Sequence, residues 1–365
     1  MFAKSLCLKN FRNISNQQLI FNSGVNIICG ENAMGKTNVI EGLWLFSSGK
    51  SFRATREKEV ISFNQDNSNL KLNFFANNRD NKFEIDLFRH TKKSINLNGV
   101  KIKKLSEIVG VFTSVLFSPE HLTLVKDGPS ERRRFIDIAL CQLKPKYLSL
   151  LSEYNKLLEQ KNAALKKAYT NSSIIDTLDI WNEKIAIIGS EIICFRALFI
   201  NELLEFAKII HNELSDGLEI LSLKYLWFSD LSATNHNEVY STYKQKQKQL
   251  RHLELKEGIT LCGPHRDDID ICLNGLSVRL YGSQGQQRSC VLSLKLAEAE
   301  LIYKEYNEYP LLLLDDVLSE LDHKRQEYIV EKIKDKQVII TCCDIEKLNN
   351  LKIGKVFYVA NGVIN

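Results

Sequence analysis

The sequence predicts an α/β fold that is built around a glycine-containing loop and interrupted by a long helical segment. Residues 25–29 (VNIIC) are mostly apolar and predict a buried strand, and residues 37–46 predict an amphipathic helix directly after the loop. A second apolar run, residues 311–314, ends in the adjacent carboxylates Asp315 and Asp316. Most of the chain between these two strands has helical periodicity. We therefore expect one α/β domain with an inserted helical arm.

The loop between the first strand and its helix fits the pattern G-x-x-x-x-G-K-[ST] without a gap. Its glycines let backbone N–H groups turn inward around a phosphate, and the new helix presents its positive end to that phosphate. Lys36 can reach the outer phosphates, and the Thr37 hydroxyl can bind Mg²⁺. A chance match would lack both the flanking strand and the flanking helix. We predict nucleotide binding by Gly30, Glu31, Asn32, Ala33, Met34, Gly35, Lys36, Thr37 and Asn38.

Two adjacent acids follow the second apolar strand. In a phosphate-loop ATPase, one such carboxylate holds Mg²⁺ and its neighbour orients the attacking water. We assign the metal role to Asp315 and the water role to Asp316. The alternative is a strand end with two solvated acids, which is common in α/β proteins. The glycine loop favours the catalytic interpretation.

A second polar turn, residues 281–289, precedes a run of strong helix formers at residues 290–301. A turn that leads into a helix N-terminus is an anion site because of its backbone donors and its dipole. One nucleotide does not need two such sites in one chain. We expect Ser283, Gly285 and Gln286 of this turn to close over the γ-phosphate held by a second copy. The alternative is a polar helix cap without a ligand.

The motifs and the periodicity divide the chain into three parts. Residues 1–120 form the N-terminal part of the ATPase domain, with short strands and a two-residue hairpin signal at Asn98-Gly99. Residues 121–257 form the helical arm. Residues 258–365 form the C-terminal part, and the chain is expected to return to the ATPase sheet from Ile259 onward.

The helical arm has its own pattern of breaks. A helix is predicted to begin at Gly128-Pro129-Ser130, and Pro145 should kink or break it. Apolar residues recur at spacings of three and four through residues 181–210, which predicts a helix about 45 Å long. The apolar face that these residues form should pack against the preceding helix, so that the two helices make an antiparallel pair. Residues 218–228 look extended, and residues 238–257 look helical.

Short segments in a fixed order extend over most of the chain. They are KNFRN (9–13), GENAMGKTN (30–38), GKSFR (49–53), FSPE (117–120), RRRF (132–135), GPHRDD (263–268), SQGQQ (283–287) and DDVLSELD (315–322). This ordered set resembles the RecF family, within the SMC class of ABC-type ATPase heads. The resemblance implies an ABC/SMC-type P-loop ATPase head with mixed sheets, interrupted by an α-helical arm. It also implies ATP and Mg²⁺ as cofactors.

The resemblance implies roles for individual residues. Ser283 begins the signature motif that completes the site of the partner copy. Residues 319–322 are similar to the loop that joins the two sites across the dimer, and Arg12 matches a position near the nucleotide phosphates. The implied site consists of Lys36, Asp316 and, in trans, Ser283 for catalysis, and of Thr37 and Asp315 for the metal.

The sequence departs from the family pattern at three places. Ala33 and Met34 stand where RecF proteins commonly have glycine and glutamine, and alanine is costly if that position needs a positive φ. Asp316 agrees with RecF proteins but stands where many other ABC-type ATPases have glutamate, and its shorter reach predicts slow hydrolysis. Residues 341–343 (TCC) stand where transporter-type ATPases place a histidine that senses the γ-phosphate.

Composition excludes several other classes. The nine cysteines include no C-x-x-C pair, so neither a zinc site nor a disulfide framework is indicated, and a reducing cytoplasm is expected. The N-terminus shows no continuous apolar targeting segment. The most apolar helical stretch, residues 185–200, contains Glu191 and Arg196 and should not span a membrane.

A net charge of +5 is modest, but basic residues are concentrated at two places. The first surrounds the predicted hairpin and either contacts DNA or guards an exposed sheet edge from aggregation. The second, on the helix after Glu238, favours a solvated surface because its charges are distributed around the helix. The run at residues 132–134 either contacts DNA or pairs with acids at the interface between two copies. The two concentrations are Lys92, Lys93, Lys101, Lys103 and Lys104, and Lys244, Lys246, Lys248 and Arg251.

The resemblance implies a function in recombinational repair of gapped replicated DNA. ATP would hold two copies together around single-stranded or gapped duplex DNA, and slow hydrolysis would release them. RecR and RecO are the implied partners in loading the RecA recombinase. Two alternatives stay open: a transporter-coupled ATPase, which needs a transmembrane partner, and a structural clamp that binds ATP without hydrolysing it.

Overall fold

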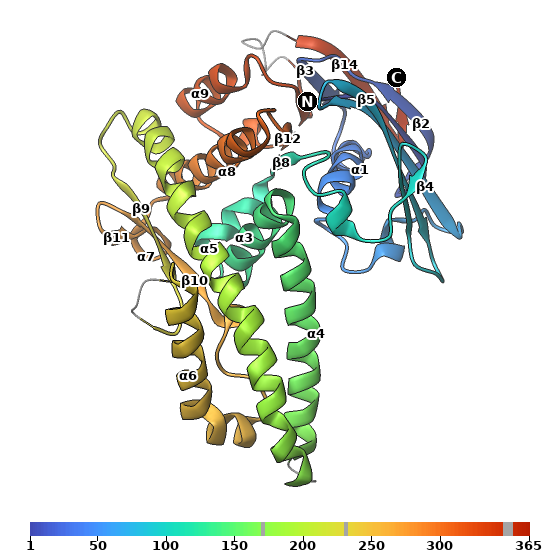
Figure 1. Cartoon of the computed structure of the whole chain (residues 1–365). Coiled ribbons are helices and arrows are strands. Elements are labelled where there is room, and N and C mark those ends of the chain that lie inside the picture. Colours follow the sequence, from blue (N-terminus) through green and yellow to red (C-terminus); the bar gives the residue numbers. More distant parts are fainter. Residues whose placement is uncertain (169–171, 230–232, 346–352) are drawn as a thin grey trace. The chain divides into compact units, whose positions relative to one another are not determined.

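The computed structural model describes residues 1–168, 172–229, 233–345 and 353–365 (Figure 1). The chain divides into two compact units: unit 1 contains residues 1–122 and 291–365, and unit 2 contains residues 123–290. The chain therefore leaves unit 1 once and returns to it once. Residues 258–290, which the sequence-based division places with the C-terminal ATPase part, group with unit 2.

A six-stranded sheet carries the nucleotide-binding elements of unit 1. Its strand order is β15-β14-β3-β13-β12-β8, and all neighbours are parallel except β14 and β15. Four of these strands are buried along their whole length, which explains their predominantly apolar sequences. The strands are β3 (Val25–Cys29), β8 (Ser114–Phe117), β12 (Leu311–Asp315), β13 (Val338–Cys342), β14 (Ile353–Ala360) and β15 (Val363–Ile364).

A second six-stranded sheet of unit 1 has the order β2-β1-β4-β5-β6-β7 and is antiparallel. The predicted hairpin is confirmed, because Leu97 pairs with Val100 and both turn residues, Asn98 and Gly99, have positive φ. Helix α1 (Lys36–Ser48) packs against strands of both sheets. The strands are β1 (Phe2–Phe11), β2 (Ile14–Ile20), β4 (Asn67–Ala76), β5 (Arg79–Phe88), β6 (Ser94–Leu97) and β7 (Val100–Lys101).

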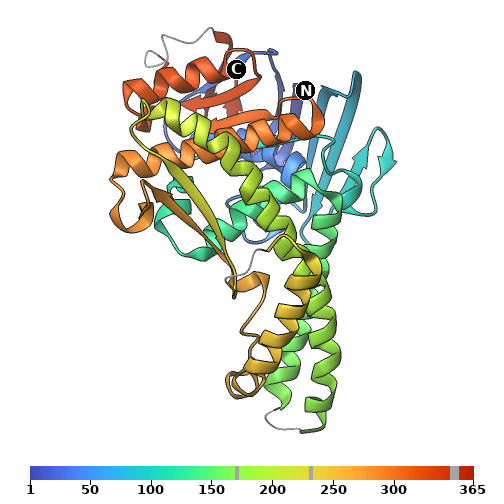
Figure 2. The same ribbon diagram turned by 60° about the vertical axis from the view of Figure 1, so that its left-hand side comes forward.

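Long helices dominate unit 2 (Figure 2). Helix α3 (Pro129–Leu143) ends just before Pro145, which begins α4 (Pro145–Ala168), so the predicted break is confirmed. Helix α5 (Leu178–Leu214) is longer than its apolar stripe predicted and packs antiparallel to α4, with α6 (His236–Glu257) beside it. None of the described helices combines the length and apolarity needed to cross a membrane.

A three-stranded antiparallel sheet in unit 2 corrects one expectation. Strand β10 (Asp268–Leu273) pairs with β9 (Leu221–Leu226) and β11 (Leu276–Ser277) rather than joining the ATPase sheet. The prediction of a return to that sheet from Ile259 onward was therefore wrong for this segment. Buried and part-exposed residues alternate along β10, as in a half-buried antiparallel strand, whereas β12 is buried throughout. After the arm, β12 is the first described strand that joins the parallel sheet of unit 1.

Four further helices and six 3₁₀ helices complete the described part of the chain. Helix α8 begins in unit 2 and continues into unit 1, and α9 follows β12. The helices are α2 (Thr123–Lys126), α7 (Val278–Tyr281), α8 (Gln284–Tyr306) and α9 (His323–Ile333), and the 3₁₀ helices are η1 (Glu57–Val60), η2 (Leu105–Glu107), η3 (Pro119–Leu122), η4 (Ser172–Thr177), η5 (Pro264–Arg266) and η6 (Leu318–Glu320).

Candidate nucleotide site

The glycine loop runs from the end of β3 to the start of α1. Gly35 precedes the first helical residue with φ of 115°, and a Cβ there would lie 2.8 Å from Asn13 Oδ1. Both facts explain why this position is glycine. Ala33 also has a positive φ, 66°, so the alanine does occupy a backbone conformation that favours glycine. The loop forms in spite of this strain.

Lys36 points back into its own loop. Its ammonium donates to the Gly30 carbonyl at 2.7 Å and lies 3.1 Å from the Sγ of Cys343. That thiol also contacts Asn32 Oδ1 at 3.0 Å. Cys343, the last residue of segment 341–343, therefore touches the loop lysine directly. The sequence had left the role of this position undecided.

Asp315 lies at the end of β12 beside the start of α1. The Thr37 hydroxyl donates to its Oδ1 at 3.0 Å, and the Thr341 hydroxyl donates to the same atom at 2.8 Å. Burial raises the pKa of Asp315, while these two hydroxyl donors oppose that shift. Residues 278 positions apart thus meet as the sequence predicted. Thr341, which the sequence analysis did not assign, completes the cluster from β13.

This cluster fits Mg²⁺ rather than a metal held by the protein alone. Mg²⁺ prefers oxygen ligands and is usually bound by one or two carboxylates together with phosphates and water. Thr37 and Asp315 offer a hydroxyl and a carboxylate oxygen in contact with each other. Within the described ranges, no group of three or more His, Cys, Asp or Glu side chains is arranged to hold a metal ion. The remaining ligands would therefore have to come from a bound nucleotide and water.

The backbone conformation of Asp316 gives this residue different contacts from those of its neighbour Asp315. Its φ is 53°, and its N–H donates to the Thr341 hydroxyl at 2.9 Å. A positive φ is uncommon outside glycine, although aspartate tolerates it better than most residues. The two adjacent acids thus share one partner, Thr341, but Asp315 uses its carboxylate and Asp316 its main chain.

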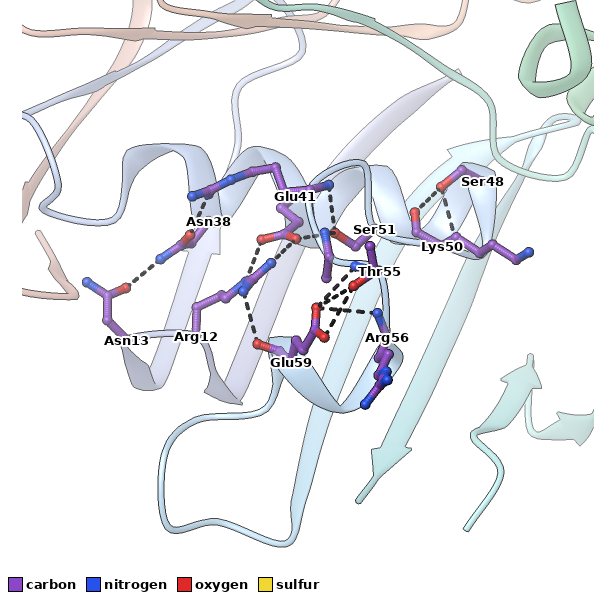
Figure 3. A network of polar contacts seen from close by, with 12 residues as sticks. Arg12, Asn13, Asn38, Glu41, Ser48, Lys50, Ser51, Thr55, Arg56 and Glu59 are labelled. Carbon is purple, nitrogen blue, oxygen red and sulfur yellow. Dashed lines mark hydrogen bonds and ion pairs between the residues drawn. The ribbon is translucent and has the colours of Figure 1, made fainter. Parts of the chain in front are cut away.

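Arg12 forms a bidentate ion pair with Glu41 of α1 (Figure 3). Its Nε and Nη2 donate to the two carboxylate oxygens at 2.8 and 2.6 Å, and its Nη1 donates to the Glu59 carbonyl at 2.9 Å. Glu41 is fully buried and also accepts from the Ser51 hydroxyl. The sequence analysis missed Glu41. The available signal was a carboxylate among the apolar residues of this helix.

Two polar contacts bring three of the ordered segments together. Asn38 Nδ2 donates to Asn13 Oδ1 at 2.7 Å (Figure 3). Arg53 donates to Asn38 Oδ1 at 3.2 Å. Asn13 also donates to the Met34 carbonyl at 3.1 Å. The segments that begin at residues 9, 30 and 49 therefore form one polar surface beside the glycine loop.

The signature turn, residues 281–289, lies in unit 2. The Ser283 N–H donates to Gln286 Oε1 at 2.8 Å, and the Gln286 N–H donates to Ser283 Oγ at 3.2 Å. These reciprocal bonds form a cap at the start of α8. Ser283 is exposed, and Gly285 and Gln286 are half-buried. Sequence analysis missed Glu219, which accepts from Gln286 Nε2 at 2.9 Å.

The basic residues of unit 2 divide into paired and exposed ones. Buried Arg132 forms a bidentate ion pair with Asp268 of the same unit, at 2.6 and 3.0 Å. Lys244 and Arg251 form ion pairs with Glu183 and Asp179.

In unit 1, Lys93 is paired with Glu57. The exposed lysines around the hairpin are Lys92, Lys101, Lys103 and Lys104.

Known proteins resemble this chain over its whole length. The RecF/RecN/SMC N terminal domain family matches residues 2–365. The DNA replication and repair protein RecF of Acetivibrio thermocellus is 43% identical over 98% of both chains. The protein of the same name from Clostridium acetobutylicum is 41% identical over 100% of this chain and 99% of its own.

Solved structures of other proteins have a fold similar to that of this chain. "Structure of the recombination mediator protein RecF-ATPrS in RecFOR pathway" matches with a TM-score of 0.94 and 35% identity, covering 100% of this chain and 97% of the other. The corresponding RecF-ATP structure has a TM-score of 0.93, 35% identity and the same coverage. An Smc head domain from Pyrococcus furiosus has a TM-score of 0.57 at 17% identity, with coverage of 100% and 95%, and supports the fold alone. The fold is that of an ABC/SMC-type P-loop ATPase head with a helical arm.

Proposed function

The chain belongs to the RecF family, and from this premise we propose that it is an ATP-dependent DNA-binding protein of recombinational repair and replication-fork maintenance in the cytoplasm. The family connects it with DNA replication and repair and with ATP. The observation that carries the proposal is the 3.0 Å contact between Thr37 of the glycine loop and Asp315 of β12. This contact brings the glycine loop, whose residues would bind the phosphates, together with the carboxylate that would bind Mg²⁺. The two residues lie 278 positions apart in the sequence.

The nucleotide is bound by residues 30–38, with Arg12 near its phosphates. Lys36 exchanges its bond to the Gly30 carbonyl for the outer phosphate oxygens. Thr37 and Asp315 would hold Mg²⁺, and the bound ion would neutralise charge on the phosphates. Asp316 orients the attacking water. Its short side chain makes hydrolysis slow. ATP binding and hydrolysis therefore switch the protein between two states and do not support rapid turnover.

Two copies are needed for a complete site. The glycine loop and the signature turn are both anion sites at helix starts, and one nucleotide uses both only if they come from different copies. Ser283 is exposed, as a residue acting in trans must be. ATP therefore holds a homodimer together on single-stranded or gapped duplex DNA, and hydrolysis releases it. Partners of this homodimer are RecR and RecO, with which it helps to load the RecA recombinase.

Sedimentation velocity tests the proposal. ATP with Mg²⁺ should convert wild-type monomers into dimers, and Ser283→Arg should abolish the dimer while ATP binding is retained. An unchanged dimer in that variant would contradict the trans site. Single-turnover hydrolysis with and without gapped DNA separates a slow ATPase from a clamp that only binds ATP.

A further inference from the structure

Glu219 lies between the end of helix α5 and the signature turn. It belongs to the segment that follows α5 and precedes β9. One carboxylate oxygen accepts from Gln286 Nε2 at 2.9 Å, and the other lies 3.0 Å from Nε2 of His211 on α5. Because a carboxylate only accepts, the His211 Nε2 atom is the donor. The three side chains form a continuous path of hydrogen bonds within unit 2.

The contact with Glu219 fixes which way the Gln286 amide faces. An amide has an accepting oxygen at one end and a donating NH₂ at the other. Since Glu219 binds the NH₂ end, the oxygen is turned toward the Ser283 N–H, which it meets at 2.8 Å. A rotated amide would place its NH₂ against this N–H and lose both bonds. The carboxylate of Glu219 therefore sets the backbone of the turn at Ser283.

His211 fixes Glu219 in turn. The His211 side chain is fully buried, whereas that of Glu219 is 21% exposed. A partly exposed carboxylate in a connecting segment would otherwise sample several rotamers. The buried imidazole holds one of them and anchors it to α5. The signature turn is thus tied by side chains to a helix that precedes it by many residues in the sequence.

We propose that Glu219 is a positioning residue for the signature turn and that His211 ties this turn to the arm helix α5. The inference rests on the proposed function, in which Ser283 completes the site of a second copy. Loss of Glu219 should leave the glycine loop and its ATP binding unchanged and should weaken the step that needs an ordered Ser283. That step is ATP-driven dimerisation.

The first test does not depend on ATP or on a dimer. Hydrogen–deuterium exchange of the peptide that contains Ser283 is compared between wild type and Glu219→Ala without nucleotide. Exchange should be at least about fivefold faster in the variant, because the Ser283 N–H loses its oriented acceptor. Glu257→Ala, at an exposed position at the end of α6, is the control and should exchange as wild type. Equal exchange in wild type and Glu219→Ala would overturn the inference.

The second test measures ATP affinity and dimerisation separately. Glu219→Ala should bind a fluorescent ATP analogue as wild type does, but its dimer dissociation constant with ATP and Mg²⁺ should rise about tenfold or more. Dimerisation as tight as wild type would overturn the inference. If wild type itself does not dimerise, the proposed function fails, and the exchange result still decides the role of Glu219.

A pair of substitutions at His211 separates hydrogen bonding from packing. His211→Gln keeps a donor near the position of Nε2, whereas His211→Leu fills space without one. The glutamine variant should keep most of the wild-type exchange protection and dimer affinity, and the leucine variant should resemble Glu219→Ala. Matching melting temperatures for the pair would show that both are folded. Equal behaviour of the two in both assays would exclude the hydrogen bond from His211 as the link.

Discussion

The Sγ of Cys343 lies 3.1 Å from the Nζ of Lys36 and 3.0 Å from Oδ1 of Asn32. Cys343 is exposed, whereas the other eight cysteines are buried or part-buried. An exposed thiol thus lies beside the lysine of the glycine loop. Lys36 itself is buried, so a bulky adduct on the Cys343 thiol would lie directly against its ammonium group.

We predict that iodoacetamide alkylates Cys343 before any other cysteine and that the adduct lowers ATP affinity at least about tenfold, by blocking Lys36. Bound ATP and Mg²⁺ should slow this alkylation by a similar factor. Peptide mass spectrometry gives the rates, and Cys343→Ser, which should bind ATP normally and resist inactivation, is the control. Alkylation of Cys343 at the same rate with and without ATP would show that the thiol is not at the nucleotide site.

The two adjacent acids should separate in function, because only the Asp315 carboxylate contacts Thr37. Asp315→Asn should weaken Mg²⁺-dependent ATP binding and hydrolysis together. Asp316→Asn should bind ATP, lower hydrolysis by about a hundredfold or more and accumulate the ATP-bound dimer. Multiple-turnover hydrolysis and sedimentation measure both effects. Wild-type turnover in Asp316→Asn would remove this residue from catalysis.

Arg12 should be needed for stability as well as for the nucleotide. Glu41 is fully buried, so Arg12→Ala leaves an unpaired carboxylate and should lower the free energy of unfolding by about 3 kcal/mol. Adding Glu41→Gln to that variant should recover part of the loss, since the uncompensated charge is gone. Denaturant unfolding of the two single variants and the double variant measures the coupling. Additive losses would mean that the pair does not interact energetically.

Local backbone chemistry explains what the sequence predicted well. The Asn98-Gly99 hairpin and the break at Pro145 depend on residues whose preferred φ is known without any tertiary contact. The Thr37 to Asp315 contact was predictable for another reason: the carboxyl ends of parallel strands meet at one edge, so a loop after one strand lies near acids after another.

Side-chain partners that are far apart in the sequence were not predictable. Glu41 and Glu219 occur in segments whose local pattern gives no sign that Arg12 or Gln286 needs them. The prediction that the chain returns to the ATPase sheet from Ile259 onward was wrong for the same reason. An alternating strand such as β10 pairs with whichever neighbour allows its apolar face to be buried, and here that neighbour is β9. In each case the partner is fixed by tertiary packing rather than by the segment itself.

His265 should make stability depend on pH. Its Nδ1 lies 2.7 Å from the Tyr154 hydroxyl and its Nε2 lies 3.1 Å from the Thr260 carbonyl, and burial lowers its pKa from 6.5 to about 4. Between these values the unfolded chain binds a proton that the folded chain does not, so stability is lost as the pH falls from 6.5 to about 4. The expected loss is roughly 2 to 3 kcal/mol.

Denaturant unfolding of wild type and His265→Gln between pH 4 and pH 7.5 measures this contribution. Burial raises the pKa of Asp267 to about 7, which favours the folded state as the pH falls. That opposing effect is present in both proteins, so the difference between their pH profiles isolates His265. Parallel profiles would show that the histidine does not change its protonation on folding.

DNA binding should depend on nucleotide and on salt, because the basic charges are dispersed and only a dimer brings two sets of them onto one duplex. Lys101, Lys103 and Lys104 are exposed beside the β6–β7 hairpin. If they contact phosphates, changing all three to glutamine should reduce the slope of log affinity against log salt by roughly two to three, since each lost contact removes about 0.9.

The control for this experiment is the triple change of Lys244, Lys246 and Lys248 to glutamine, on helix α6, where Lys244 is already paired with Glu183. It removes the same charge from a surface that we expect to be solvated and should leave the slope unchanged. ATP-driven dimerisation should survive both triple changes. If the hairpin variant keeps the slope and affinity of wild type, its lysines protect the sheet edge formed by β7, and exposed Arg134 at the base of the arm becomes the better candidate for contact with DNA.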